Sequence, residues 1–221
     1  MYKNYEVWII DGNSDDSTTT FLKTLSSPFY WISEKDSGIY DAMNKGIALS
    51  KGEWFYFLGA DDQLINKTIL NTLFSEKIPE HISLIAGAIA YDKKSTPFIY
   101  SKNKRIKTAS WSYLMWIRNG LHHQGTFYRK RLFNKNRYHL GYKILSDYAF
   151  NISLFVLKNK CLTTDVLIAK CQGNGISKSG NFNMYMEEVQ LKSDQSHWIL
   201  KPLFFVISFT KYVLRKVIHH S

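Results

Sequence analysis

Residues 54–62 read WFYFLGADD, a run of bulky, largely apolar side chains followed at once by a glycine, an alanine and two aspartates. A continuous run of this kind is typical of a central strand that is covered on both faces. The same order of features occurs earlier, where residues 6–10 (EVWII) lead into Asp11 and Gly12. Two predicted strands therefore end in carboxylates.

Helical and strand patterns alternate through the first 92 residues. We expect strands over residues 6–10, 29–32, 54–58 and 82–91, and helices over residues 16–25, 40–49 and 65–74. This alternation predicts an α/β fold with a mostly parallel sheet flanked by helices. Beyond it we expect a basic loop or hairpin over 93–107, an aromatic helix or turn over 111–117 and a helix over 146–157.

Carboxylates at strand ends suggest a ligand site, because open α/β sheets bind ligands beyond the carboxyl ends of their strands. Asp61 and Asp62 could hold Mg²⁺ or Mn²⁺, which accept one or two carboxylates and fill their other positions with phosphate and water. Such an ion would neutralise a leaving diphosphate. Structural roles are the alternative for each of these residues. Asp61 and Asp62 could cap the next helix, and Asp11 could lie in an ordinary turn. Asp36 and Asn44 could be loop or capping residues.

The charge balance favours anionic partners. Lys and Arg outnumber Asp and Glu by 29 to 18, a formal net charge of +11, which suits phosphates, nucleic acid or an acidic membrane face. We find no zinc, helix-turn-helix or RNP pattern, so nucleic acid is not an expected partner. Cys161 and Cys171 suggest neither a disulfide framework nor a zinc site, and we find no signal peptide, so we expect a cytoplasmic protein.

The C-terminal segment has a pattern of its own. Residues 203–218 predict a helix in which Ser208, Lys211 and Arg215 fall on one stripe and the rest is bulky and apolar. One reading is a helix packed against its own domain. The other is a basic amphipathic helix on the cytoplasmic leaflet, which would place the protein peripherally on the inner face of the plasma membrane. No apolar run approaches the ~20 residues of a membrane span.

Three motifs together carry a family resemblance. Residues 9–18 (IIDGNSDDST), 33–46 (SEKDSGIYDAMNKG) and 51–62 (KGEWFYFLGADD) resemble, in order and spacing, inverting family 2 glycosyltransferases, especially the branch that builds capsule, exopolysaccharide and O-antigen. Residues 123–128 (HQGTFY), 146–150 (SDYAF) and 173–177 (GNGIS) resemble later segments of that branch. The likeness covers about residues 5–180.

The resemblance implies a GT-A-like, Rossmann-like fold and a nucleotide-diphosphate sugar donor. Asp11 would contact the nucleobase, and Asp36 would help to hold the nucleoside. Asn44 belongs to the same nucleotide-sugar set. Asp61 would approach the ribose or the metal, and Asp62 would bind the Mn²⁺ or Mg²⁺ that bridges the diphosphate.

The resemblance also assigns the catalytic and acceptor residues. Asp147 would be the general base that takes a proton from the acceptor hydroxyl, with a helix N-cap as its alternative role. His123 and Gln124 would contact acceptor or phosphate, or make structural hydrogen bonds instead. His122 leaves the alignment of that motif open by one position. The acceptor would be a saccharide or a lipid-linked saccharide.

The resemblance further implies a domain over residues 1–180, with a nucleotide-sugar half (1–92) and an acceptor half (93–180). Residues 181–221 match no segment of the family, and their residue pattern predicts a helical tail. The family begins with another strand and helix before residues 2–5, so we expect an N-terminally shortened sheet. Loss of an inner strand would expose backbone groups or force its neighbours to pair anew. The alternative function is therefore a truncated, inactive relative that binds nucleotide or a partner protein.

Overall fold

The computed structural model describes residues 2–92, 105–172 and 180–219. The strands are β1 (Val7–Asp11), β2 (Phe29–Ser33), β3 (Trp54–Tyr56), β4 (Gln63–Leu64), β5 (Ile82–Tyr91), β6 (Ile106–Lys107), β7 (Thr126–Arg129) and β8 (Lys160–Cys171). The α-helices are α1 (Thr18–Leu22), α2 (Ile39–Leu49), α3 (Ile69–Leu73), α4 (Ser146–Val156), α5 (Phe182–Asp194) and α6 (Lys201–His219). Short 3₁₀ turns are η1 (Tyr113–Trp116), η2 (His123–Gly125), η3 (Lys130–Phe133) and η5 (Trp198–Leu200).

The predicted α/β fold is confirmed, but the sheet is mixed rather than mostly parallel. The larger sheet has the order β3-β7-β5-β8-β4, with β6 beside β5. Only β5–β8 and, in a separate sheet, β1–β2 are parallel pairs; the other four described pairs are antiparallel. The cause is the second half of the chain, where β7 returns between β3 and β5 instead of following a helical crossover.

Strand β3 corrects one expectation, because it lies at the end of the strand order and not at its centre. Its side chains nevertheless pack against core residues on both faces. Phe55 joins a core formed with α2 and α4, while Trp54 and Tyr56 pack on the opposite side with Phe74, next to α3. An edge strand covered on both faces thus has the composition of a central one.

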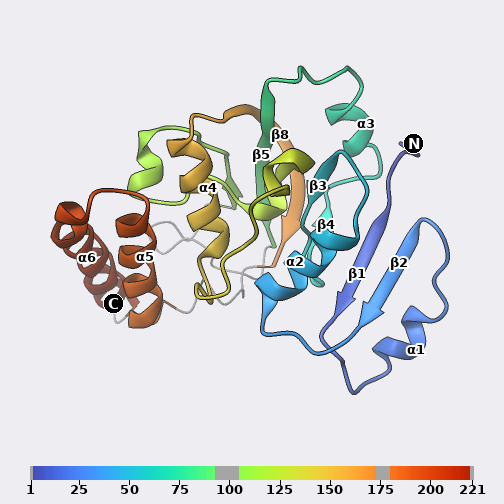
Figure 1. Ribbon diagram of the computed structural model, residues 1–221, viewed down its shortest axis with the longest axis horizontal. Helices are drawn as coiled ribbons and strands as arrows, with labels where there is room; N and C mark the ends of the chain where they lie inside the picture. The colour runs from blue at the N-terminus through green and yellow to red at the C-terminus, as the bar shows by residue number, and fades with distance from the viewer. Residues whose placement is uncertain (1, 93–104, 173–179, 220–221) are drawn as a thin grey trace.

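The N-terminal strands form a two-stranded sheet of their own, at the end of the molecule opposite α6 (Figure 1). Helix α2 covers β1, and a Cβ on Gly46 would lie 3.5 Å from Ile10 Cγ1. Among the described residues, β1 pairs only with β2 and β3 only with β7. β1 and β3 are therefore not paired with each other, and each has one edge without a strand partner in the described chain.

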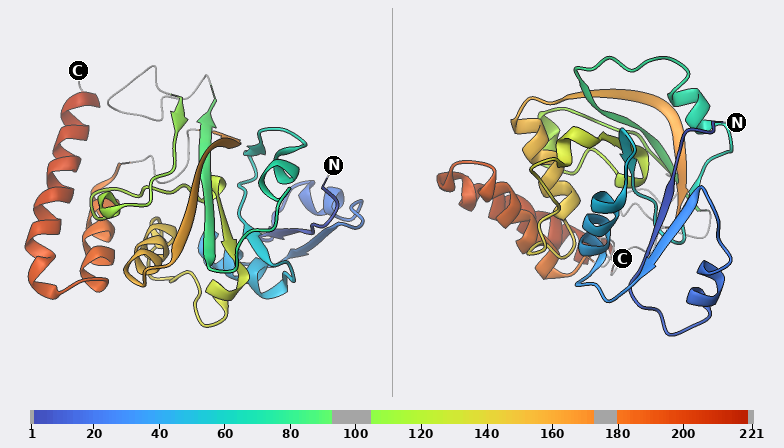
Figure 2. Two further views of the ribbon diagram at one scale, coloured as in Figure 1. Left: turned by 90° about the horizontal axis from the view of Figure 1, so that it is seen from above. Right: turned by 45° about the vertical axis from the view of Figure 1, so that its right-hand side comes forward.

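The C-terminal helices form the outermost layer at the other end. Helix α5 lies between α4 and α6, as Figure 1 and the left-hand view of Figure 2 show. A third core cluster joins α4 to α5 and η1 through Met115, Ile152 and Leu191. No helix in the described ranges is long and apolar enough to cross a membrane.

Candidate functional site

The turn after β1 is closed by Asp11. Its buried carboxylate accepts hydrogen bonds from Ser14 N (3.1 Å), Ser14 Oγ (2.5 Å) and Ser33 Oγ (2.6 Å). The hydrogen bonds from Ser14 and then from Ser33 hold the pKa of Asp11 below its usual value. Because β1 and β2 are parallel, their carboxyl ends meet, and Asp11 fastens one to the other.

Asp36 lies directly over this turn. A Cβ on Gly12 would approach Asp36 Oδ2 to 2.8 Å, so a larger residue there would displace the carboxylate. Asp36 Oδ1 accepts a hydrogen bond from Gly38 N (2.9 Å), which begins α2. The structure thus brings Asp11 and Asp36, two predicted nucleotide-sugar residues, to one edge of the N-terminal sheet.

Asn44 has a different environment. Its side chain donates from Nδ2 to the Tyr138 carbonyl and accepts from the Tyr138 N–H, both at 2.9 Å. Both polar atoms of the amide are therefore used to attach α2 to the segment before α4. This arrangement gives Asn44 a structural function that the sequence pattern does not reveal.

The two aspartates after β3 diverge. Asp62 Oδ2 accepts from Gln124 Nε2 (2.5 Å) and Oδ1 from Gln172 N (3.0 Å). Gly59 makes room for this carboxylate, since a Cβ there would lie 2.7 Å from Asp62 Oδ2. Asp61 is exposed and lines a separate cavity of about 60 Å³. Neither caps α3, whose N-cap is Thr68.

The η2 turn connects Asp62 with the predicted base. Gln124 contacts Asp62, and His123 Nδ1 lies 3.5 Å from Asp147 Oδ2. His122 stacks against His123 with ring centroids 5.3 Å apart. His123 is thus the residue of the pair that meets Asp147.

Asp147 lies in the first turn of α4 with 9% of its surface exposed. The N-cap is Leu145, so Asp147 does not cap the helix. The Tyr40 hydroxyl lies 2.9 Å from Asp147 Oδ1 and 2.6 Å from the Ile144 carbonyl. Burial alone would raise the pKa of Asp147, but the hydrogen bond and charge of His123 and the Tyr40 hydroxyl outweigh it and lower the pKa. The surroundings of Asp147 thereby favour its ionised form.

Glu187 on α5 supports this region, and nothing in the sequence pattern points to it. Its carboxylate accepts from the backbone N–H groups of Lys143 (3.1 Å), Ile144 (2.9 Å) and Leu145 (2.6 Å). These N–H groups precede the first helical residue of α4, so no carbonyl of that helix can accept from them, and Glu187 supplies the acceptor. Glu187 therefore positions the start of the helix that carries Asp147.

The residues around Asp62 fit a hard divalent cation in donor type. Gln124 Oε1 is buried, and no hydrogen-bond donor of the described chain reaches it. An amide oxygen beside a carboxylate suits Mg²⁺ or Mn²⁺ when phosphate and water complete the coordination. Within the described ranges no group of three or more His, Cys, Asp or Glu side chains could hold a metal without such help.

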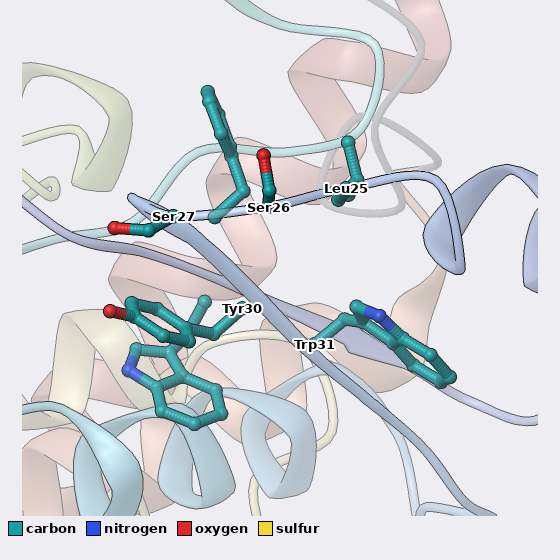
Figure 3. Close-up of a pocket in the computed structure, with 7 residues that line it drawn as sticks. Leu25, Ser26, Ser27, Tyr30 and Trp31 are labelled. Atoms are coloured by element: carbon teal, nitrogen blue, oxygen red, sulfur yellow. The ribbon is translucent and has the colours of Figure 1, made fainter.

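The larger cavity lies elsewhere. It measures about 350 Å³, opens beside β1 and β2 and is lined by Trp8, Leu25, Ser26, Ser27, Phe29, Tyr30 and Trp31 (Figure 3). Tyr30 and Trp31 point to opposite sides of β2, and Tyr30 stacks on Trp8 at 5.1 Å. None of the predicted site residues lines this cavity. The predicted loop 173–177 lies outside the described residues.

The fold is that of the GT-A glycosyltransferases. It superimposes on Staphylococcus aureus TarS 1-349 in complex with UDP-GlcNAc with a TM-score of 0.62 and 15% identity, covering 95% of this chain and 63% of that one. It also matches the Pyrobaculum calidifontis mannosyltransferase PcManGT in complex with GDP-Man and Mn²⁺, with a TM-score of 0.56, 13% identity and coverage of 95% and 60%.

Sequence comparison identifies the family within this fold. The family model for glycosyl transferase family 2 matches residues 1–137, and the chain belongs to that family. A PGL/p-HBAD biosynthesis glycosyltransferase of Mycobacterium bovis is 34% identical over 168 residues, 73% of this chain. The match covers 61% of that relative, so the chain spans about three fifths of its length.

Proposed function

We propose that the chain transfers a hexose-type sugar from a nucleotide-diphosphate sugar to a saccharide or lipid-linked acceptor in cell-envelope polysaccharide synthesis. The transfer would invert the anomeric carbon and use Mn²⁺ or Mg²⁺. The observation that carries the proposal is the η2 turn, where His123 and Gln124 contact Asp147 and Asp62 respectively. Two consecutive residues of one turn thus contact the candidate base, Asp147, and the candidate metal ligand, Asp62.

On the donor side, Asp62 and Gln124 would hold the divalent ion, which supplies charge neutralisation for the leaving diphosphate. Asp11 and Asp36 would meet the nucleoside at the carboxyl ends of β1 and β2. The strand ends that bear these three aspartates match the place where open α/β sheets bind ligands. The GT-A relatives bound to UDP-GlcNAc or to GDP-Man and Mn²⁺ support this donor class.

On the acceptor side, Asp147 would remove the proton of the acceptor hydroxyl as its oxygen attacks the anomeric carbon. The bond from that carbon to the diphosphate oxygen breaks as the new one forms, and one such displacement inverts the configuration. Tyr40 and His123 fix the two carboxylate oxygens, so the base is oriented before the acceptor arrives. The domain division proposed with this function is 1–92 for the donor, 93–180 for the acceptor and 181–221 for the tail.

The test is calorimetric binding of UDP, GDP and dTDP, with and without Mn²⁺, to the wild-type chain. We expect metal-dependent binding of one nucleotide, lost in Asp62→Ala and retained in Asp61→Ala, because only Asp62 contacts Gln124. If both variants still bind the nucleotide as the wild type does, Asp62 is not part of the donor site. Asp147→Asn should keep nucleotide binding and lose transfer; unchanged transfer would exclude Asp147 as the base.

A second function has its own support. The edges of β1 and β3 that lack strand partners in the described chain would suit a relative that binds nucleotide or a partner protein without turnover. Metal-dependent nucleotide binding without turnover of any donor sugar would favour this function. Contact with an anionic membrane, which the charge and the tail predict, concerns another face and is independent of donor binding.

A further inference from the structure

Helix α6 presents its apolar side outward, the reverse of an ordinary surface helix. The predicted polar stripe faces the protein: Ser208 is buried, and Lys211 pairs with buried Glu188. The opposite side exposes large apolar residues, Val206 at 60% among them, along a helical arc of roughly 140°. The residues of this arc are Leu203, Val206, Phe209, Val213, Leu214 and Val217, and exposed Phe205 lies beside it.

The rotation of the helix is fixed by buried charge. Glu188 on α5 accepts from both Lys192 and Lys211, and both ammonium groups also donate to the Ile117 carbonyl, at 3.3 and 2.6 Å. Turning the apolar arc inward would carry Lys211 away from Glu188 and from the Ile117 carbonyl, and two hydrogen bonds of a charged group would be lost. The outward apolar face is therefore a stable feature of the packing.

The surroundings of this face indicate which partner covers it. Trp198, 75% exposed, and Ile199 extend the apolar surface at the start of α6. Lys201 and Lys216 are exposed on the same helix, and the sequence has no Asp or Glu after Asp194. An apolar arc bordered by lysines with a tryptophan at one end is the composition of a helix lying in a lipid interface.

A second copy of the chain is the weaker candidate for this face. Each copy carries a formal net charge of +11, so pairing two such faces brings like charges together. An anionic lipid surface instead attracts the same charge. We propose that the outward face of α6, with Trp198 and Ile199, docks on an anionic lipid bilayer with the helix parallel to the membrane plane.

The surface goes beyond the proposed function, and its test does not depend on catalysis. Cosedimentation with vesicles of phosphatidylcholine containing about one third phosphatidylglycerol should retain the wild-type chain, and pure phosphatidylcholine should retain much less. Val206→Ser combined with Phe209→Ser should lower vesicle partitioning roughly tenfold or more, because both side chains leave the interface. Phe21→Ser, which alters an equally exposed side chain on α1, is the matched control and should change nothing.

Three results would overturn the proposal. They are equal binding of the double variant and the wild type, equal binding to neutral and anionic vesicles, or a concentration-dependent dimer that the double variant abolishes. Circular dichroism melts should be unchanged in all variants, since the substituted residues are exposed. Nucleotide binding measured in the same samples separates failure of docking from failure of the donor site.

Discussion

Removing the Glu187 carboxylate should loosen the start of α4. Glu187→Ala leaves three backbone N–H groups, those of residues 143–145, without their common acceptor. Hydrogen bonds to a charged group are each worth ~1.5–3 kcal/mol, and water replaces part of this at a half-exposed site. We therefore expect the free energy of unfolding to fall by about 3 kcal/mol, roughly a hundredfold in the folding equilibrium.

Glu187→Gln removes the negative charge but keeps an oxygen that can accept hydrogen bonds. Its amide oxygen can still accept from Ile144 and Leu145, which share Oε1, so we expect a loss of only about 1 kcal/mol. Gln190→Ala, at an exposed position on the same helix, is the control and should stay within about 0.5 kcal/mol of the wild type.

The assay is urea unfolding followed by circular dichroism at pH 7, with the slope on urea checked for constancy. Transfer activity should fall in Glu187→Ala through kcat more than through KM for the donor, because Asp147 lies just beyond the loosened segment. If Glu187→Ala is as stable as Gln190→Ala, the carboxylate does not hold α4 and the reasoning is refuted.

Two other substitutions test structural assignments. Asn44→Ala should lower the free energy of unfolding by about 2 kcal/mol, because two hydrogen bonds to Tyr138 are lost, and leave nucleotide affinity unchanged in calorimetry; a tenfold loss of affinity would restore Asn44 to the donor site. Lys192→Met tests a pH dependence: burial lowers the pKa of Lys192 to about 8, below the ~10.4 of an unfolded lysine. At Lys192 the unfolded chain therefore binds more protons between these values, and this residue should contribute up to about 3 kcal/mol of added stability there as pH rises. Urea melts at pH 7.5 and 10 should show the stability of the wild type rising by that amount relative to Lys192→Met, since the two cysteines titrate alike in both proteins; parallel pH profiles would contradict it.

The sequence predicts those elements whose identity depends on local pattern. Strand β5 occupies the predicted residues 82–91, since a ten-residue apolar run bounded by polar residues has few other solutions. Helix α4 and strand β1, which ends at Asp11, were also predictable. Helix α1 is shorter than expected, ending at Leu22, and the helix predicted over 65–74 begins only at Ile69, after β4.

Features that depend on long-range contacts could not be predicted in this way. Strand β8 lacks a clear alternation because it pairs with β5 through register shifts, so its side chains change face along its length. The meeting of His123 with Asp147 depends on how η2 packs against the neighbouring strands β5 and β8. Glu187 looks like any acidic residue on a helix until its three backbone partners are known.

Helix α5 sets a fixed spacing between its two neighbours, because its consecutive residues Glu187 and Glu188 form hydrogen bonds to different ones. Glu187 accepts from the segment before α4, and Glu188 accepts from Lys211 on α6. Adjacent helical positions differ by about 100° in direction and about 1.5 Å in height, and neither offset can change without unwinding the helix. The start of α4, which carries the proposed base Asp147, and the C-terminal helix are therefore held at one set separation, and a displacement of α6 would carry the start of α4 with it.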